Sequence, residues 1–171
     1  MQRKQAVQIF YATLALLMCF VASAQGASTK PTATTTPTSV TNPLEAVSGR
    51  WYTEGHEGGV ELYPCDDQIC GRFSWMKDEN GEVSRDTNNP DPAERQRPLC
   101  HMQFMGNFTP EGKNRYTGGW IYNPRDGGIY SAQMTLVDHD TLDLHGYLFI
   151  PLLGQSQTWK RAKNMPSCLH D

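Results

Sequence analysis

The chain has little positive charge. Its 171 residues include 15 Lys and Arg against 18 Asp and Glu, and from Leu44 onward twelve basic residues face eighteen acidic ones, a formal net charge of −6. A protein that binds nucleic acid needs a basic face that follows the phosphates. The short basic clusters at 95–97 and 160–163 stand among acidic residues. We therefore expect no nucleic-acid partner.

The sequence also lacks the local motifs of common enzyme classes. It contains no Gly-x-Ser-x-Gly elbow, no His-Glu-x-x-His pair and no glycine-rich phosphate loop, which mark serine hydrolases, zinc proteases and nucleotide-binding enzymes. Catalysis by carboxylates stays open. A glycosidase-like mechanism would need two carboxylates in one cleft, and the candidates are Glu61, Asp86, Asp91 and Asp126. Catalytic residues are thus unassigned, and we expect no cofactor.

Long apolar runs are absent except at the amino terminus. The uncharged run 9–21 follows a basic start and closes on Ala22-Ser23-Ala24. It is shorter than the ~20 residues of a membrane-spanning helix, and the small residues of the tripeptide suit signal peptidase. We expect 1–24 to be a cleaved signal peptide, which leaves no transmembrane span and exports the protein to the periplasm or beyond. A lipid anchor on Cys19 is a minor alternative, since Met18 is large for a lipoprotein signal.

The next segment, 25–43, consists mainly of Ser, Thr, Ala and Pro and has almost no large apolar residue. Such a composition cannot bury enough surface to offset the entropy of ordering, so it predicts a disordered linker. The remaining residues, 44–171, match the size of one domain with its own core. We expect one globular domain after the linker and no second one.

This expected domain retains four cysteines, Cys65, Cys70, Cys100 and Cys168. Export to an oxidising compartment favours disulfides, and three pairings are possible. Cys65 and Cys70 flank four residues between two strand-like runs, so a hairpin would place them opposite each other. Cys100 then pairs with Cys168. Zinc is the rival interpretation, but the spacing is not Cys-x-x-Cys and the histidines form no ligand pattern, so we expect no metal site.

The domain consists of short runs rich in aromatic and β-branched residues, separated by Gly, Asp, Asn and Pro. In several runs, such as 129–137, apolar and polar residues alternate, which predicts strands with one buried and one wet face. The turn sequences suit hairpins. The predicted strands are 49–53, 58–63, 69–77, 102–108, 115–122, 129–137, 141–150 and 156–161.

About eight antiparallel strands with short connections predict a meander, and a meander of this size avoids exposed edges best by closing on itself. The expected fold class is therefore all-β, a small closed antiparallel barrel. Gly49-x-Trp51 resembles the start of the first strand in the lipocalin superfamily. That resemblance implies a barrel end plugged by Trp51 beneath a basic residue of the last strand, for which Arg161 is the candidate.

A series of motifs runs through the domain: Gly49-x-Trp51, Tyr63-x-Cys65 with Cys70-Gly71, Asp86-x-x-Asn89-Pro90-Asp91, Arg95-x-Arg97-Pro98-Leu99, Gly118-Gly119-x-Ile121-Tyr122-x-Pro124-x-Asp126-Gly127, Gly146-Tyr147, and Leu153-Gly154-x-x-Gln157-Thr158-Trp159-x-Arg161. In this order they resemble an uncharacterised family of exported bacterial proteins, domain-of-unknown-function family twenty-one forty-seven. The resemblance covers nearly the whole domain. It implies export and a lipocalin-like barrel, and it implies no settled activity. One position departs from it, because His101 stands where a Gly is expected.

The segment 82–99 is the exception to the strand pattern. It is polar, contains three prolines and is too long for a plain turn, and loops of this length in compact domains are often functional. Paired guanidinium groups can clamp an anion, so a small polar or anionic ligand is one prediction for this loop. Its candidate ligand-binding residues are Asp86, Asn89, Arg95 and Arg97, and four more lie in the later motifs: Tyr122, Asp126, Tyr147 and Gln157.

A structural role for the same loop is the alternative prediction. The sequence 89–92 is ordinary turn chemistry, and the arginines would then tie the loop to acidic neighbours such as Asp126. An EF-hand calcium loop is excluded. Counted from Asp86, the sixth position is Asp91 instead of Gly and the twelfth is Arg97 instead of Glu.

These patterns favour an exported protein that binds a small ligand or a component of the cell envelope inside the barrel. Two alternatives stay open: a structural or protein-interaction module of the envelope, and a small secreted hydrolase that uses carboxylates. An open pocket of mixed polarity favours binding, and a filled barrel with an exposed apolar patch favours the interaction module. Two converging carboxylates of different acidity favour hydrolysis.

Overall fold

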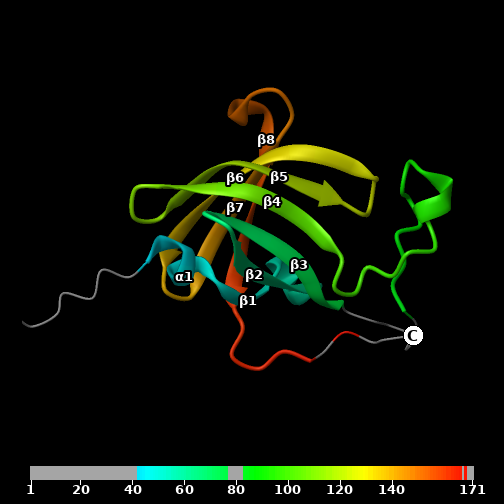
Figure 1. The fold of residues 1–171 in the computed structure, drawn as a ribbon, viewed down its shortest axis with the longest axis horizontal. Coiled ribbons are helices and arrows are strands. Elements are labelled where there is room, and N and C mark those ends of the chain that lie inside the picture. The colour runs from blue at the N-terminus through cyan, green and yellow to red at the C-terminus, as the bar shows by residue number, and fades with distance from the viewer. Residues whose placement is uncertain (1–41, 77–82, 167, 169–171) are drawn as a thin grey trace, which may run out of the picture. The chain divides into compact units, whose positions relative to one another are not determined.

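The computed structural model describes residues 42–76, 83–166 and 168. In this part of the chain eight antiparallel strands close into a barrel in chain order, and β1 pairs with both β2 and β8 (Figure 1). The predicted all-β closed barrel is confirmed. The strands are β1 (Gly49–Tyr52), β2 (Gly58–Cys65), β3 (Gln68–Met76), β4 (Gln103–Glu111), β5 (Arg115–Asn123), β6 (Gly128–Asp138), β7 (Thr141–Tyr147) and β8 (Gly154–Arg161).

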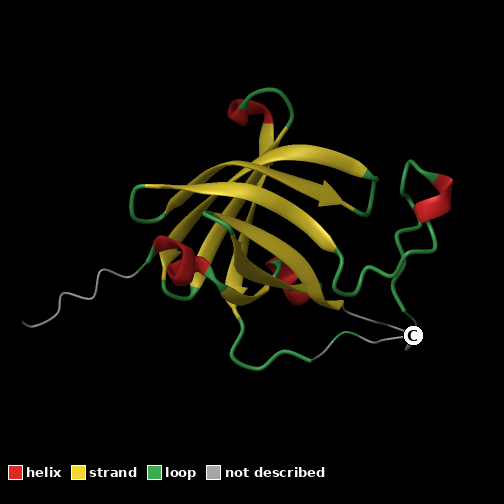
Figure 2. Cartoon of the chain, viewed as in Figure 1, coloured by secondary structure: helices red, strands yellow, loops and turns green. Residues whose placement is uncertain are grey.

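Among the described residues, four short helical segments lie outside the strands (Figure 2). The antiparallel order places the β1–β2, β3–β4, β5–β6 and β7–β8 connections at one end of the barrel, which we call the loop end. The helix before β1 lies at the opposite end, which we call the helix end, and Figure 1 shows it on the left with segment 83–99 on the right. The segments are α1 (Pro43–Val47) and the 3₁₀ turns η1 (Glu54–His56), η2 (Pro92–Glu94) and η3 (Pro151–Leu153).

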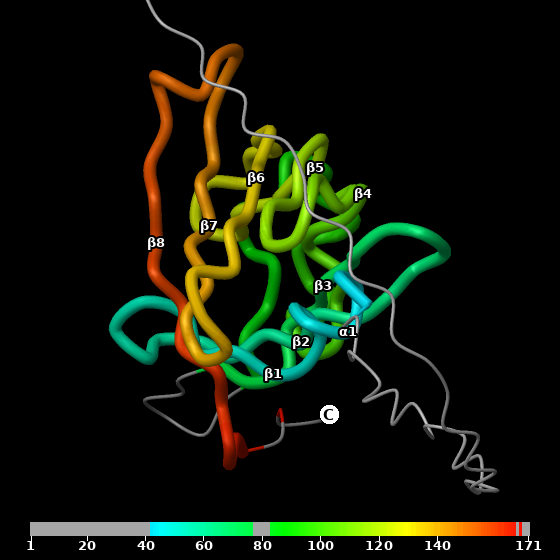
Figure 3. Tube along the Cα trace, turned by 90° about the vertical axis from the view of Figure 1, so that its left-hand side faces the viewer, coloured from blue at the N-terminus to red at the C-terminus, as the bar shows by residue number. Residues whose placement is uncertain are grey.

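Strand β7 is shorter than the sequence predicts. It ends at Tyr147 instead of continuing to 150. Phe149 has a φ of 63°, a left-handed conformation that an aromatic residue rarely adopts, and the chain there turns out of the sheet. The turned view in Figure 3 shows the β7–β8 connection reaching beyond its neighbours at the top. The apolar residues 148–150, which the sequence assigned to this strand, are therefore exposed.

The inward-facing side chains form one apolar core. Trp51, Phe108 and Tyr116 are fully buried although they come from β1, β4 and β5. In β6 the predicted alternation places Ala132 and Met134 inside. Each large side chain buried in this way contributes about 1.5–3 kcal/mol relative to an exposed one. The core therefore receives side chains from strands all around the barrel and stabilises them together.

Arg161 of β8 connects the parts of the helix end. Its Nη1 and Nη2 donate to the carbonyl oxygens of Ser48 at 2.7 Å and Ala46 at 2.8 Å. Its guanidinium lies 4.1 Å from the ring centroid of Trp51, and Trp51 Nε1 donates to the carbonyl oxygen of Val47 at 3.0 Å. These donors satisfy carbonyl groups that a helix end leaves unpaired. Arg161 and Trp51 thus join the first strand, the last strand and α1 at the helix end.

The described residues include two that precede the predicted domain boundary at residue 44. Asn42 caps α1, since its side chain accepts from Leu44 N at 3.0 Å, and Pro43 occupies the first turn, where the missing N–H is no loss. The Tyr116 hydroxyl donates to the carbonyl oxygen of Pro43 at 2.5 Å. The predicted signal peptide and the rest of the predicted linker lie outside the described residues. Within the part that the structure describes, no helix has the length and apolar character to cross a membrane.

After β8 the chain turns back across the outside of the barrel. The Tyr52 hydroxyl of β1 donates to the carbonyl oxygen of Asn164 at 2.6 Å. Further along, the Ser74 hydroxyl of β3 lies 3.1 Å from Met165 Sδ, and Ser74 is buried there. The carboxyl-terminal residues are thus led from the helix end, where β8 stops, toward the loop end of β3.

Candidate functional site

A cavity of about 1320 Å³ opens at the loop end of the barrel. Its rim includes residues from all four connections at that end. Its deeper wall consists of aromatic and aliphatic side chains that are more than nine-tenths buried: Phe73, Phe104, Tyr122, Leu144 and Trp159. The barrel interior is therefore not filled by its own side chains, and the space inside reaches the surface.

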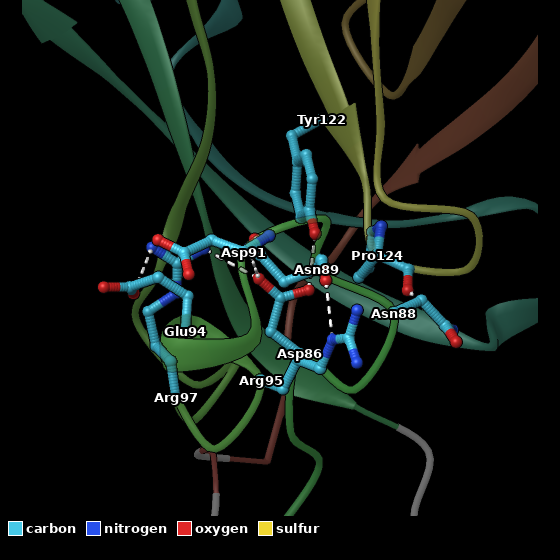
Figure 4. A network of polar contacts seen from close by, with 9 residues as sticks. All are labelled: Asp86, Asn88, Asn89, Asp91, Glu94, Arg95, Arg97, Tyr122 and Pro124. Atoms are coloured by element: carbon cyan, nitrogen blue, oxygen red, sulfur yellow. Dashed lines mark hydrogen bonds and ion pairs between the residues drawn. The ribbon is translucent and has the colours of Figure 1, made fainter.

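Asp86 is the centre of the loop beside this opening (Figure 4). Its side chain is fully buried. Tyr122 Oη donates to Oδ1 at 2.6 Å, and Asn89 Nδ2 and Arg97 Nη2 each donate to Oδ2 at 2.7 Å. Burial raises the pKa of Asp86, but the hydrogen bonds from Tyr122, Asn89 and Arg97 outweigh it and hold the pKa below its usual value. The carboxylate therefore stays ionised and anchors the loop to β5.

The same contacts set the state of Tyr122. Burial, followed by its hydrogen bond to Asp86, raises the pKa of Tyr122 to about 12. The phenol is thus neutral, and its hydroxyl hydrogen is donated to the Asp86 carboxylate. The side of the ring that lines the cavity offers an apolar surface, and the hydroxyl is unavailable as a donor to a ligand.

The rest of the loop is held by contacts within itself. Arg95 Nε donates to the carbonyl oxygen of Asn89 at 2.8 Å, and Asn89 Oδ1 accepts from Asp91 N at 2.9 Å. Asp91 in turn caps η2 by accepting from Ala93 N at 2.9 Å. Arg97 reaches Asp86 as well as Glu94, 3.2 Å away. The predicted clamp of two arginines on an anion is not what the structure shows, because each guanidinium binds an oxygen of its own loop.

Asn88 attaches this loop to the β5–β6 turn. Its Nδ2 donates to the carbonyl oxygens of Pro124 at 3.2 Å and Arg125 at 3.1 Å. On the other side, a Cβ at Gly127 would overlap the carbonyl oxygen of Asn88, and Gly127 has a φ of 70°. Two reasons therefore favour glycine at this position: the left-handed backbone conformation and the close approach of the Asn88 carbonyl group. The loop and the turn form one rigid part of the rim.

The β7–β8 connection provides the apolar part of the rim. Leu148 and Leu153 line the cavity and are 50% and 68% exposed, whereas Phe149 is 94% exposed. Beneath them, the His145 ring lies with Nδ1 2.8 Å from Ser156 Oγ and Nε2 2.7 Å from the carbonyl oxygen of Pro151. The imidazole therefore fastens η3 to β8. Sequence reasoning missed this feature, although the uninterrupted apolar run 148–153 was its signal.

Comparison with known proteins agrees with the barrel and its motifs. Residues 49–161, which include all eight strands, match a family described as "Uncharacterized protein conserved in bacteria (DUF2147)". The chain belongs to this DUF2147 family. No curated protein matches it at a significant level.

Among solved structures, the DUF2147 chain is similar to one titled "Protein HP1028 from the human pathogen Helicobacter pylori belongs to the lipocalin family". The TM-score is 0.62 and the identity 23%, over 68% of this chain and 83% of that chain. Likeness at this level of identity shows the fold. The DUF2147 barrel is therefore lipocalin-like.

The eight predicted ligand-binding residues of this DUF2147 protein fall into two groups. Asp86, Asn89, Arg95 and Arg97 form the loop scaffold described above and do not line the cavity. The other four line it: Tyr122, Asp126, Tyr147 and Gln157. Three of these already have partners: Tyr122 binds Asp86, Gln157 Oε1 accepts from Trp159 Nε1 at 3.1 Å, and Asp126 accepts hydrogen bonds within its own turn. Contact of any of them with a ligand stays a prediction.

The structural alternative expected Arg95 and Arg97 to tie the loop to Asp126, but the partners of Asp126 lie in its own turn and in β6. Its Oδ1 accepts from Gly128 N at 2.8 Å, and its Oδ2 accepts from Asn123 Nδ2 at 2.9 Å and Tyr130 Oη at 2.8 Å. Burial raises the pKa of Asp126, but these hydrogen bonds outweigh it and lower the pKa. The carboxylate therefore organises its own turn.

The four carboxylates named for hydrolysis are each held by other groups. Glu61 binds Arg72 at 2.7 Å, Asp91 caps η2, and Asp86 and Asp126 accept the hydrogen bonds given above. The pKa values of Asp86 and Asp126 are both shifted downward, whereas a glycosidase-like pair needs one carboxyl with a raised pKa. The geometry therefore gives no support to carboxylate hydrolysis by these residues.

The four cysteines among the described residues, of which Cys168 follows the matched range 49–161, are in two states. Cys65 and Cys70 form a disulfide across the β2–β3 hairpin, with Cα atoms 5.8 Å apart. Cys100 and Cys168, predicted to form a second disulfide, are free thiols, although their sulfur atoms lie within 4.8 Å of each other. Bond formation would remove two electrons and two protons, which proximity alone does not do. Burial, followed by the neighbouring Cys168, raises the pKa of Cys100 to about 12.

Proposed function

We propose that this protein is exported and encloses a small, largely apolar ligand in the barrel cavity, such as a component of the cell envelope. The observation that carries the proposal is the cavity of about 1320 Å³ with a buried aromatic and aliphatic wall and a rim of mixed polarity. An open pocket of this kind is the feature that distinguishes a ligand-binding barrel from a filled one.

The size of the cavity supports a ligand and not only trapped water. Pockets for small molecules have volumes of about 300–1,000 Å³, and an eight-stranded barrel interior is often just filled by side chains. Here the wall residues Phe73, Leu144 and Trp159 leave a larger space. Burying apolar ligand surface against them would contribute roughly 25 cal/mol per Å² before the cost of association.

The polarity of the lining supports the apolar class. The buried hydroxyl of Tyr122 is bound to Asp86, and Arg125 at the rim forms an ion pair with Glu57. These groups are therefore less available to a charged headgroup. Leu148 and Leu153 extend the apolar wall to the outer surface, which supports entry of an apolar ligand from this side.

The exposed apolar connection also supports a second candidate, a protein-interaction module. Phe149, Leu152 and Leu153 are 94%, 88% and 68% exposed, and exposed apolar patches mark interaction sites as well as ligand-binding mouths. The two candidates differ in where a bound molecule touches the protein. An enclosed ligand touches Trp159, whereas a partner held only by residues 148–153 does not.

Quenching of tryptophan fluorescence by a brominated fatty acid tests the proposal. Bromine quenches on contact, and Trp159 is the tryptophan that lines the cavity. We expect saturable quenching in the unaltered protein, its loss in Trp159→Phe, and its retention in the matched control Trp75→Phe, since Trp75 packs edge-on against Tyr52 instead. Unsaturable quenching, or equal quenching in both variants, would refute enclosure. Native mass spectrometry of protein from its own host would then identify a ligand or a partner.

A further inference from the structure

Three side chains with metal-binding atoms meet outside the cavity wall. The sulfur atoms of Cys100 and Cys168 and a ring nitrogen of His101 all lie within 4.8 Å of one another. Cys168 is 6% exposed and Cys100 is half-buried, whereas His101 faces solvent. Neither the cavity nor the loop scaffold uses these groups.

The carbonyl group of Phe73 positions this cluster. It accepts from His101 N at 2.9 Å, and the Cys168 thiol lies 3.9 Å from the same oxygen. The Phe73 N–H donates to the carbonyl oxygen of Met102 at 3.1 Å. One residue of β3 therefore holds both the turn that carries Cys100 and the end of the carboxyl-terminal segment.

The contacts of that segment explain how Cys168 arrives there. Asn164 and Met165 are held by Tyr52 and Ser74, as described above, and a Cβ at Gly59 would overlap the Met165 side chain. The segment thus lies close against β2 and β3 before it reaches Cys168. The packed contacts of Asn164 and Met165 thus bring the chain to β3, whose Phe73 carbonyl oxygen lies beside the Cys168 thiol.

The backbone at His101 allows two neighbouring residues to contribute ligands. In an extended chain, consecutive side chains point to opposite faces. His101 instead has a φ of 60°, a left-handed conformation that is uncommon for residues other than glycine and that tends to occur at functional sites. With this turn, the ligand atoms of Cys100 and His101 both come within reach of Cys168.

We propose that Cys100, His101 and Cys168 form a site for one soft d¹⁰ metal ion, Zn²⁺ or Cu⁺. Two thiolates and an imidazole are the ligand types that such ions prefer. Metal–sulfur bonds of about 2.3 Å and metal–nitrogen bonds of about 2.0–2.1 Å place tetrahedral ligand atoms roughly 3.5–4 Å apart, so the observed cluster needs only a small contraction. A fourth position stays open to water or to an external ligand. This site is independent of the function proposed for the cavity.

The chemistry of the site is distinct from that of a disulfide. On metal binding each thiol gives up its proton and remains reduced, so no electron is transferred. A Cys100–Cys168 disulfide would instead need a thiol oxidant that accepts two electrons, and it would remove both sulfur ligands. The reduced protein is therefore the metal-binding form.

Titration of the reduced, full-length exported protein tests the site. Under anaerobic conditions we expect one Zn²⁺ or Cu⁺ per chain in competition with a chromophoric chelator, and Co²⁺ should give the absorption bands of thiolate coordination. Cys100→Ser and Cys168→Ser should each weaken binding by at least about tenfold and diminish those bands. His101→Gly should weaken binding too, and it suits the left-handed backbone, so its fold is preserved.

The matched control is His139→Ala, which removes an exposed histidine next to Asp140 and should leave binding unchanged. Tighter competition by one of the two ions would identify the metal, and either ion supports the proposal. The proposal is overturned if the reduced chain binds neither ion, if the Cys100→Ser/Cys168→Ser double variant binds as tightly as the unaltered protein, or if the two sulfurs form a disulfide that mild phosphine reduction does not open.

Discussion

The Arg161 guanidinium covers the indole ring of Trp51, 4.1 Å from its centroid, and the two residues are paired partners across the β8–β1 junction that closes the barrel. Arg161 also donates to three backbone carbonyl groups, including that of His139 in the β6–β7 turn at 2.6 Å. One side chain thus joins the first and last strands to α1 and a neighbouring turn.

Replacing these two residues should have unequal and coupled effects. Trp51→Ala removes a fully buried ring and should lower the free energy of unfolding by about 3–5 kcal/mol. Arg161→Ala should cost less, because Arg161 is only partly buried, although it loses three hydrogen bonds as well as a cation–π contact worth roughly 0.5–2 kcal/mol. Urea unfolding of a double-mutant cycle should give a coupling energy above about 0.5 kcal/mol, because contacting residues are not additive. If the stability losses of the two single variants add up to that of the double variant within error, Trp51 and Arg161 do not act together in closing the barrel.

Asp86→Asn should destabilise the protein at neutral pH by about 1–3 kcal/mol, since the buried hydrogen-bond network loses a charged acceptor. The folded pKa of Asp86 is below its ordinary value of 3.8. Its stabilising contribution is therefore complete above that value and is lost as the pH falls through the folded pKa. The difference between variant and unaltered protein should shrink below about pH 4 in chemical unfolding.

The control for this titration is Asp67→Asn, in the exposed β2–β3 turn, which should change the unfolding free energy at neutral pH by less than about 0.5 kcal/mol. A constant difference between Asp86→Asn and the unaltered protein from pH 7 to pH 2 would show that the carboxylate does not have this role.

Gly127→Ala should release the loop 83–99 from the β5–β6 turn. A Cβ there overlaps the carbonyl oxygen of Asn88, in addition to the cost of a φ of 70°. Gly112→Ala is the matched control, because Gly112 has a φ of 74° with nothing within 4 Å of the added Cβ. The control should lose about 1–2 kcal/mol from backbone strain alone. Gly127→Ala should lower the free energy of unfolding by more than Gly112→Ala does, and it should speed proteolysis within 83–99. Equal losses of stability in the two variants would disprove the close packing of this loop on the β5–β6 turn.

Phe149→Asn should leave the stability unchanged or slightly raised. The ring is 94% exposed and buries little surface, and its φ of 63° suits Asn better than Phe. Ile129→Asn is the control, since Ile129 is also exposed, at 66%, but lies within β6, where Asn is disfavoured. Thermal unfolding should give a lower midpoint temperature for Ile129→Asn than for Phe149→Asn. Light scattering should also show less self-association for Phe149→Asn, because the substitution reduces the exposed apolar surface of the β7–β8 connection.

The mature protein should begin at Gln25. This follows from the Ala22-Ser23-Ala24 site after an apolar run too short to span a bilayer. The intact mass of protein isolated from the host envelope checks it. A mass that retains the first 24 residues, or a diacylglycerol on Cys19, would contradict the expected export route.

The strands and the pairing of consecutive strands in hairpins could be predicted because their signals are local. Alternation at 129–137 and the turn residues around each run depend on neighbours along the chain. Most predicted strand ends are within a few residues of the observed ones, and the largest overrun is at 148–150, where apolar residues continue past the end of β7. Residues 148–150 look like a continuing strand, but the left-handed backbone at Phe149 takes them out of the sheet.

The partners of polar residues could not be predicted in the same way. The pattern at 86–97 marks an unusual loop, yet nothing in it tells that Arg97 binds Asp86 while Arg95 binds a carbonyl group. Similarly, the histidines show no ligand spacing along the chain, although His101 lies beside two cysteines in the fold. Such pairings depend on which segments pack together.

The sequence by itself determined the eight strands and the hairpin pairing of consecutive strands, because strand periodicity and turn chemistry act over a few residues. Only the tertiary structure decided that the barrel keeps a cavity, that Asp86 accepts a hydrogen bond from Tyr122 of β5, and that Cys168 lies beside Cys100. Each of these rests on contacts between residues far apart in the chain. The arrangement of those contacts follows from the packing of the whole barrel, which no local pattern specifies.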